Sequence, residues 1–351
     1  MPYIENWEEV RGAFEAWWTH ELGRPIVQVY GPGPREKHFD FWCFLKHRDN
    51  PDALRRALEE FPETVSCWGD AFPTLLPNLG PGCLAAYFSG YLHFDHFNNT
   101  AWFENAQPWE VVEQLTFDVD NEWWQYTQAV NQLAADVAKD RFLLGVTDIG
   151  GILDVLASLR GAQNLLMDLL HEPERIDLMR ARIIEAWHRV DDALAPAVAH
   201  VQEGTSSWLQ AWCPERYSPL QCDFCAMISP AMFERFVAPD VYNQCQRLDR
   251  AIYHLDGPGQ IPHLDMLLDI PELDGIQWVP GDAHPSCESP RWYPMYEKIL
   301  GSGKLLLLQF FRDPSDIPRM LDALPHEGLM LTVTASSQQE ARALLRSTCP
   351  R

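Results

Sequence analysis

Residues 251–281, AIYHLDGPGQIPHLDMLLDIPELDGIQWVPG, decide the fold that we expect for this chain. A short apolar run at 251–253 ends in a polar tip that contains His254 and Asp256. A helix-like segment rich in leucine follows, and a second apolar run at 276–279 ends in Pro-Gly. Strand, polar tip, helix and strand in this order predict a βαβ unit. A buried strand has no structural use for His and Asp at its last positions, so we expect functional residues there.

The same alternation of apolar runs and amphipathic segments extends over the whole chain. We expect eight strand-like runs: seven strands at 25–30, 141–146, 207–212, 251–253, 276–279, 304–310 and 329–333, and a short element at 221–228. Helical patterns lie at 4–22, 51–61, 120–138, 152–159, 162–170, 173–201, 231–248, 290–300, 314–324 and 338–345. This order predicts an α/β fold, a (β/α)8 TIM barrel that forms a single domain over 1–351. It would carry an N-terminal helical extension and an insertion at 72–109 rich in Pro, Gly and aromatic residues.

Composition and charge narrow the function classes. The 351 residues are 46% hydrophobic and 22% charged, which is ordinary for an enzyme with a large core. A net charge of −23, from 27 Lys+Arg against 50 Asp+Glu, argues against nucleic acid or an anionic membrane as partner. It fits a small-molecule substrate that is cationic or neutral. The sequence is also compatible with a homodimer.

Localisation is predicted from cysteine usage and from the first residues. The nine cysteines are scattered and odd in number, which disfavours a disulfide framework. Residues 1–5 are not basic and no apolar stretch follows them, so we expect no signal peptide. No window is apolar enough for a membrane span. We therefore expect a cytoplasmic protein.

His254 and Asp256 are the candidate catalytic residues. Residues i and i+2 of a strand face the same side, so both side chains can reach one ligand. A His beside a carboxylate on a rigid strand can act as a general acid/base or as a metal-binding pair. The structural alternative is a core histidine with a loop-capping aspartate. Six further residues at comparable positions are expected to bind substrate: Asp148, Trp212, Asp223, Tyr253, Gln277 and Trp278.

Two other groups of metal-binding residue types are weaker candidates. Cys222 and Cys225 form a single CxxC, and no second pair completes a structural zinc site, so we expect packed thiols. The segment HFDH at 93–96 lies in the aromatic insertion, where we expect a surface cluster.

Four stretches resemble the uroporphyrinogen decarboxylase-like superfamily, which includes the corrinoid and coenzyme M methyltransferases. They are CDFCAMISPAMFERFVAPD at 222–240, YHLDGPG at 253–259, LDGIQWVPG at 273–281 and YEKILGSGK at 296–304. The resemblance covers most of the chain and implies a cytoplasmic barrel enzyme. True decarboxylases carry an N-terminal MRQAGR-like signature that holds the substrate carboxylates. Residues 28–34 read QVYGPGP instead, so we do not expect a true uroporphyrinogen decarboxylase.

The methyltransferase branch implies zinc, bound by a His-x-Cys at this strand end and by a later Cys. His254 matches the first ligand, but Asp256 stands where the first Cys would be, and 332–336 reads TVTAS without a Cys. A bound metal would therefore occupy a harder, oxygen-richer site made by His254, Asp256 and Asp223. Without a metal, the His-Asp pair would act as an acid/base.

The resemblance implies a methyltransferase or demethylase in a corrinoid-linked pathway. The acidic charge of the chain and the aromatic residues at strand ends favour a small, methylated, cationic substrate. The corrinoid would be carried by a partner protein. One alternative is a decarboxylase or other lyase, which predicts arginines converging on the barrel mouth; the candidates are Arg160, Arg216, Arg291 and Arg312. Another is a non-catalytic ligand-binding barrel, in which His254 and Asp256 would point away from any cavity.

Overall fold

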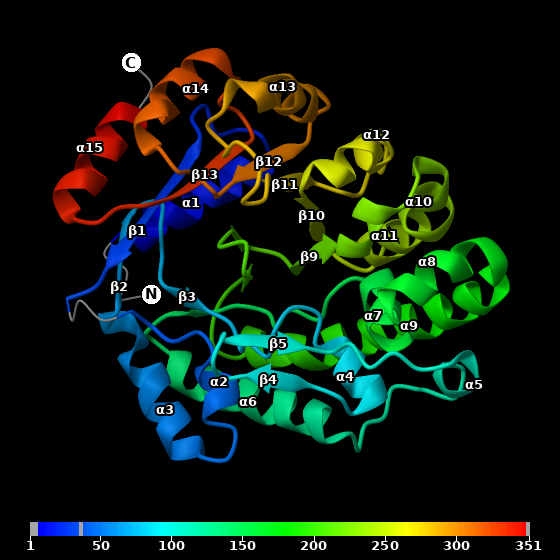
Figure 1. Ribbon diagram of the computed structural model, residues 1–351. Coiled ribbons are helices and arrows are strands. Elements are labelled where there is room, and N and C mark those ends of the chain that lie inside the picture. Colours follow the sequence, from blue (N-terminus) through cyan, green and yellow to red (C-terminus); the bar gives the residue numbers. More distant parts are fainter. Residues whose placement is uncertain (1–5, 35–37, 349–351) are drawn as a thin grey trace.

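The structure is a computed structural model that describes residues 6–34 and 38–348 (Figure 1). Its helices are α1 Trp7–Trp18, α2 Cys43–Lys46, α3 Pro51–Glu60, α4 Leu84–Ser89, α5 Trp109–Val112, α6 Glu122–Ala138, α7 Ile152–Arg160, α8 Ala162–His171, α9 Pro173–Ala199, α10 Pro230–Phe236, α11 Ala238–Cys245, α12 Leu264–Leu268, α13 Tyr293–Gly301, α14 Ile317–Ala323 and α15 Gln338–Thr348. Its strands are β1 Ile26–Pro32, β2 Val65–Gly69, β3 Thr74–Leu75, β4 His93–Asp95, β5 Thr100–Trp102, β6 Leu143–Leu144, β7 Thr205–Ser206, β8 Trp212–Cys213, β9 Tyr217–Gln221, β10 Arg250–Asp256, β11 Gly275–Val279, β12 Leu305–Leu308 and β13 Leu329–Thr334.

A parallel sheet forms the centre of this α/β fold. Its strand order is β2-β1-β13-β12-β11-β10-β9, with β2 antiparallel at one edge and the other six strands parallel. The short strands β3 and β6 also pair in parallel, and Gly145 bridges Ser206 in the same sense. The elements follow one another around a ring in chain order (Figure 1), as in a TIM barrel. No continuous ladder joins these sheets within the described residues, so a closed eight-stranded barrel stays a prediction.

Period-two alternation along the strands separates the core into two regions. In β12, Leu305 and Leu307 belong to a cluster that α1 closes at one end, whereas Leu306 and Leu308 belong to the larger cluster under the other helices. All four are fully buried, as expected for a parallel strand covered on both faces. In β10 the same alternation places Ile252, His254 and Asp256 on one side of the strand.

The predicted strand at 207–212 is wrong. The chain forms a small hairpin, β7 and β8, and residues 207–211 between these strands make an irregular loop with Gln210 at a φ of 60°. The prediction rested on the alternation of Trp208, Gln210 and Trp212, which is also compatible with a loop. Two side-chain amides hold this loop instead, because Gln28 Nε2 donates to the Gln210 carbonyl at 2.9 Å and Gln309 Nε2 to the Leu209 carbonyl at 2.8 Å.

Other expected boundaries shift for local reasons. The expected element at 221–228 is a 3₁₀ helix at Asp223–Met227, and the strand before it, β9, was not predicted. The helix at 231–248 divides into α10 and α11 at Val237, because Pro239 lacks the N–H that a continuous helix needs. Strand β2 was also not predicted.

The insertion at 72–109 contains the short elements β3, α4 and the β4–β5 hairpin. At the N-terminus, α1 begins at Trp7, and the expected helix start at Ile4 lies outside the described residues. So does the segment 1–5 on which the expectation about a signal peptide rested. Among the described residues, no helix has the length and apolarity needed to cross a membrane.

Candidate functional site

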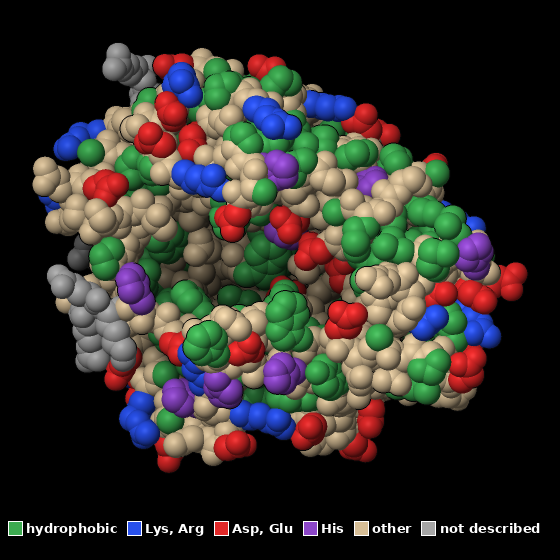
Figure 2. Space-filling model, in the orientation of Figure 1, with side chains coloured by type: hydrophobic (Ala, Val, Ile, Leu, Met, Phe, Trp, Pro, Cys, Tyr) green, Lys and Arg blue, Asp and Glu red, His purple; other side chains and the backbone are tan. Residues whose placement is uncertain are grey.

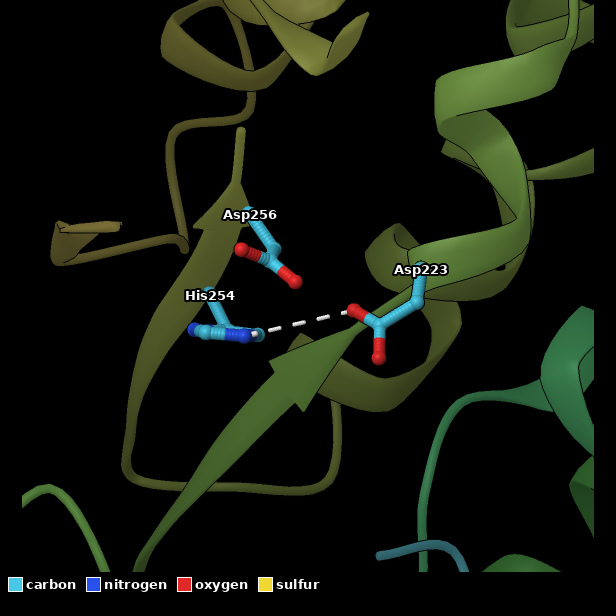
Figure 3. Close-up of side chains that lie close together, drawn as sticks. All are labelled: Asp223, His254 and Asp256. Carbon is cyan, nitrogen blue, oxygen red and sulfur yellow. Dashed lines mark ion pairs between the residues drawn. The ribbon is translucent and has the colours of Figure 1, made fainter. Parts of the chain in front are cut away.

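Three side chains converge at the carboxyl ends of β9 and β10. His254 and Asp256 lie at the end of β10, and Asp223 opens the 3₁₀ helix that follows β9. One ligand atom of each lies within 4.8 Å of the others, and Figure 3 shows the side chains facing a common point. His254 Nε2 is 4.0 Å from Asp223 Oδ1. The parallel register, which pairs His254 with Gln221, brings the two strand ends side by side.

A chain of hydrogen bonds decides which nitrogen of His254 faces the cluster. Gln309 Nε2 donates to the Leu209 carbonyl, so Gln309 Oε1 is left to accept from Gln277 Nε2 at 2.6 Å. Gln277 Oε1 therefore faces His254 Nδ1, and since it can only accept, Nδ1 carries the proton. In a neutral ring the lone pair is then on Nε2, which faces the two carboxylates, and this is the tautomer that a metal ion requires.

Trp208 forms one wall beside the cluster. Its ring stands edge-on to the His254 ring, with centroids 5.0 Å apart and an interplanar angle of 86°. The residue belongs to the loop at 207–211, which the amides of Gln28 and Gln309 hold. Trp208 is therefore a fixed surface rather than a mobile side chain on an exposed loop.

Two further carboxylates lie behind the cluster. Asp154, in the first turn of α7, accepts from the backbone N–H groups of Asp223 at 3.0 Å and Phe224 at 2.8 Å, which fixes the start of the 3₁₀ helix. Burial, reinforced by Asp223, raises the pKa of Asp154 to about 7. Burial raises the pKa of Asp148 to about 6; Gly150 N–H donation opposes this rise and Asp223 adds to it.

Partial burial also raises the pKa of the Asp223 carboxyl; the neighbouring His254 opposes that rise and Asp256 adds to it. Each of these shifts reflects negative charge that is crowded and poorly solvated. A bound cation would relieve this cost at Asp223, Asp154 and Asp148 together.

The cluster stands between two hollows at the same end of the sheet. A cavity of about 1040 Å³ is lined by Trp208 and by residues at the ends of β1 and β13. A smaller cavity of about 320 Å³ is lined by Asp223, Asp154 and Gln221. Figure 2 shows a deep hollow in this face, with acidic side chains gathered along one edge.

Three residues expected to bind substrate lie in the core instead. Tyr253 and Trp278 are fully buried. Each is next to a residue on the side of the cluster, His254 or Gln277, so its own side chain points to the opposite side of the strand. Trp278 packs against Trp292, with ring centroids 5.0 Å apart. Trp212 lies at the other end of the sheet, where its carbonyl accepts from Trp18 Nε1 at 2.8 Å. Their assignment as pocket residues is corrected.

The arginines that a decarboxylase would need do not converge. Arg312 lines the larger cavity, but the other three candidates are held elsewhere. Their partners are Asp168 for Arg160, Asp191 and Asp192 for Arg216, and the Trp292 ring for Arg291.

Cysteine ligands are also absent from the cluster. The eight cysteines that the structure describes are free thiols, and Cys222 and Cys225 are buried. Burial raises the pKa of Cys222 well above its ordinary value, so it stays protonated. Asp95 of the HFDH segment accepts from the N–H groups of Phe97 and Asn98 in its own hairpin, a structural role. The donor set that remains, one imidazole and two carboxylates, fits a divalent cation with open coordination positions.

Three residues of the site were not found from the sequence: Trp208, Gln309 and Asp154. Gln309 ends the apolar run KLLLLQ, and a polar residue at that position was an available signal. Asp154 and Trp208 carry no sequence signal, because their roles come from segments that meet only in the folded chain.

No protein-family model and no curated protein matches this chain. Its structure is similar to that of a methyltransferase from Methanosarcina mazei, with a TM-score of 0.63 over 97% of this chain and 98% of that chain. The two sequences are 10% identical. At this identity the likeness shows a shared fold and leaves the reaction to be argued from the site.

Proposed function

We propose that this protein is a metal-dependent enzyme of the uroporphyrinogen decarboxylase-like superfamily with a methyltransferase or demethylase activity. The metal would be zinc or another divalent cation, held by His254, Asp256 and Asp223. A corrinoid carried by a partner protein is the proposed second reactant. The observation that carries the proposal is the convergence of these three side chains at adjacent strand ends, beside a cavity.

The residues around the cluster support a metal rather than a metal-free pair. His254 presents Nε2 because Gln277 holds the proton on Nδ1. Asp154 anchors the backbone of Asp223, so the third ligand is positioned without the ion. A divalent cation at this point would act as a Lewis acid toward a heteroatom of the substrate. His254 and the two carboxylates bind and orient, and Trp208 limits access of water from one side.

The alternatives receive less support from the same geometry. A decarboxylase is disfavoured because three of its four candidate arginines have partners elsewhere, and Arg312 alone among the four lines the larger cavity. A non-catalytic barrel predicts His254 and Asp256 turned away from any hollow, whereas they face Asp223, which lines one. The M. mazei protein is a methyltransferase with the same fold, which is consistent with the proposal.

Metal content tests the proposal directly. The purified protein is stripped with a chelator, equilibrated with Zn²⁺ or Co²⁺, and analysed for bound metal. We expect one ion per chain, lost in Asp256→Asn and in His254→Ala. Asp282→Asn is the matched control, because this rim carboxylate is fully exposed and outside the cluster.

Methyl transfer is then measured as loss of methylcobalamin absorbance with 2-mercaptoethanol as acceptor. The thiolate attacks the methyl carbon, the cobalt–carbon bond breaks, and the electron pair remains on cobalt, giving a methyl thioether and cob(I)alamin. We expect turnover in the metal-loaded protein only. A chain that binds no metal, or whose turnover is the same in Asp256→Asn, would contradict the proposal.

A further inference from the structure

The larger cavity lies beside the metal-binding cluster rather than on it. Its walls come from the carboxyl ends of β1 and β13, the segment after β12, and the loop at 207–211. The volume of about 1040 Å³ is at the upper end of small-molecule sites. A substrate of a few atoms would leave most of this volume empty, whereas a compound of several rings would fill it.

Aromatic side chains stand out among the residues that line this cavity. Six of them line it: Tyr30, Phe39, Phe41, Phe61, Trp208 and Phe311. Phe39 is the centre of one group, with its ring edge-to-face against Phe41 at 5.2 Å and Phe61 at 4.9 Å. Rings arranged in this way offer both faces and edges to a flat ligand, the arrangement that aromatic pairs prefer.

The fixed charges that the structure describes around the cavity already have partners. Arg312 Nη2 donates to the Asp282 carbonyl at 2.6 Å. Glu340 Oε2 accepts from the backbone N–H and the hydroxyl of Ser336, at 2.8 and 2.6 Å. His38, which also lines the cavity, lies exposed at the rim. Among the described residues that line the cavity, a charged ligand body would lose hydration and meet no Arg or Glu side chain that is free of such contacts, which disfavours it.

Trp208 joins the cavity to the cluster. It lines the cavity, and its ring also stands 5.0 Å from that of His254. We infer that the substrate is an uncharged, ring-bearing compound whose aromatic body fills this cavity and whose heteroatom end passes Trp208 to the cluster. This inference rests on the proposed function for the role of the cluster. It assigns the acidic charge of the site to holding the metal, so the substrate itself need not be cationic.

Three probes of the same shape and different charge test the substrate class. These are 2-naphthol, which is neutral at pH 7, 2-naphthoate, an anion, and 2-naphthylmethylamine, a cation. Binding to the full chain is measured by isothermal titration calorimetry. We expect 2-naphthol to bind at least roughly tenfold more tightly than either charged probe, because burying an unpaired charge is costly.

Two ring-removing variants locate the bound probe. Trp208→Leu and Phe39→Leu keep an apolar side chain and should each weaken 2-naphthol binding roughly three- to tenfold, the range of one aromatic contact. Phe97→Leu is the control, because Phe97 is 93% exposed and does not line the cavity. Circular dichroism checks that each variant is folded, and either of the two variants suffices for the test.

Repeating the titration with metal-free protein and with Asp256→Asn separates the two proposals. Both should still bind 2-naphthol saturably, because the rings that line the cavity do not depend on the metal ligands, and they should lose at most the contact between the naphthol oxygen and the ion. If the chain binds the probe but no metal, the proposed function is wrong and the inferred substrate class stands. Equal or tighter binding of a charged probe, no saturable binding of 2-naphthol, or unchanged binding in both Leu variants would overturn the substrate class while leaving the metal centre intact.

Discussion

Replacing Gln277 with leucine removes the residue that selects the tautomer of His254. Gln277 is 1% exposed, and leucine has a similar volume, so the packing is largely kept. The variant leaves His254 Nδ1 and Gln309 Oε1 without their partners. Loss of such an outer partner lowers metal affinity about 10- to 100-fold, or about 1.4–2.7 kcal/mol. Two unsatisfied groups that are partly buried should also lower the free energy of unfolding of the metal-free protein by on the order of 1–3 kcal/mol in total, less than two fully buried groups would cost.

Competition with a chromophoric chelator measures the Zn²⁺ affinity, and urea unfolding of the chelated protein measures the stability. Gln277→Glu is the informative companion, because a carboxylate still accepts from Nδ1–H while it loses the donor to Gln309. We expect it to retain Zn²⁺ affinity within a few-fold, whereas Gln277→Leu does not. Gln132→Leu, on the exposed face of α6, should change neither quantity. If Gln277→Leu binds Zn²⁺ as tightly as the wild type, the tautomer argument is wrong.

Three further outcomes follow from burial and pairing. In the metal-free protein, burial raises the pKa of Asp148 from 3.8 to about 6, so the folded state holds this proton more tightly and the free energy of unfolding falls as pH rises through that window. Asp148→Asn should abolish this fall, which amounts to on the order of 2–3 kcal/mol in the free energy of unfolding from urea melts across the window. The same dependence on pH in the variant would contradict the assignment. Trp278→Ala should cost on the order of 3–5 kcal/mol in thermal or urea unfolding while the folded protein keeps its metal affinity, because Trp278 packs on Trp292; a specific loss of metal affinity would argue for a pocket role. Arg180 pairs with Asp240 through two buried bonds of 2.8 Å, so Arg180→Met should destabilise by about 3–5 kcal/mol in urea melts and adding Asp240→Leu should recover much of that. No recovery in the double variant would contradict this account.

Much of the fold was predictable because it depends on local pattern. The run KLLLLQF reads as a strand covered on both sides, and β12 is buried along its whole length. The segment at 207–212 failed because its alternation is equally compatible with a loop whose polar groups are satisfied by distant amides. Gln28 is 182 residues from Gln210 in the chain, so no local signal could reveal that contact.

The candidate site shows the same division. His254 and Asp256 were named from the sequence because residues i and i+2 of a strand share a side. The same rule places Tyr253 and Trp278 on the opposite side, although their residue types had suggested contact with a substrate. Asp223 was named from the sequence, but its place beside His254 depends on the register of β9 against β10.

The sequence by itself determined the strands β10 to β13, most of the helices and the pair of polar residues that ends β10, since these follow from side-chain periodicity. Only the tertiary structure decided that Asp223 is the third member of the cluster and that Gln309 and Gln277 orient His254. It also decided that Trp208 connects the cluster to an aromatic cavity. These relations join segments far apart in the chain, and their distances are set by strand pairing and packing, which no local pattern encodes.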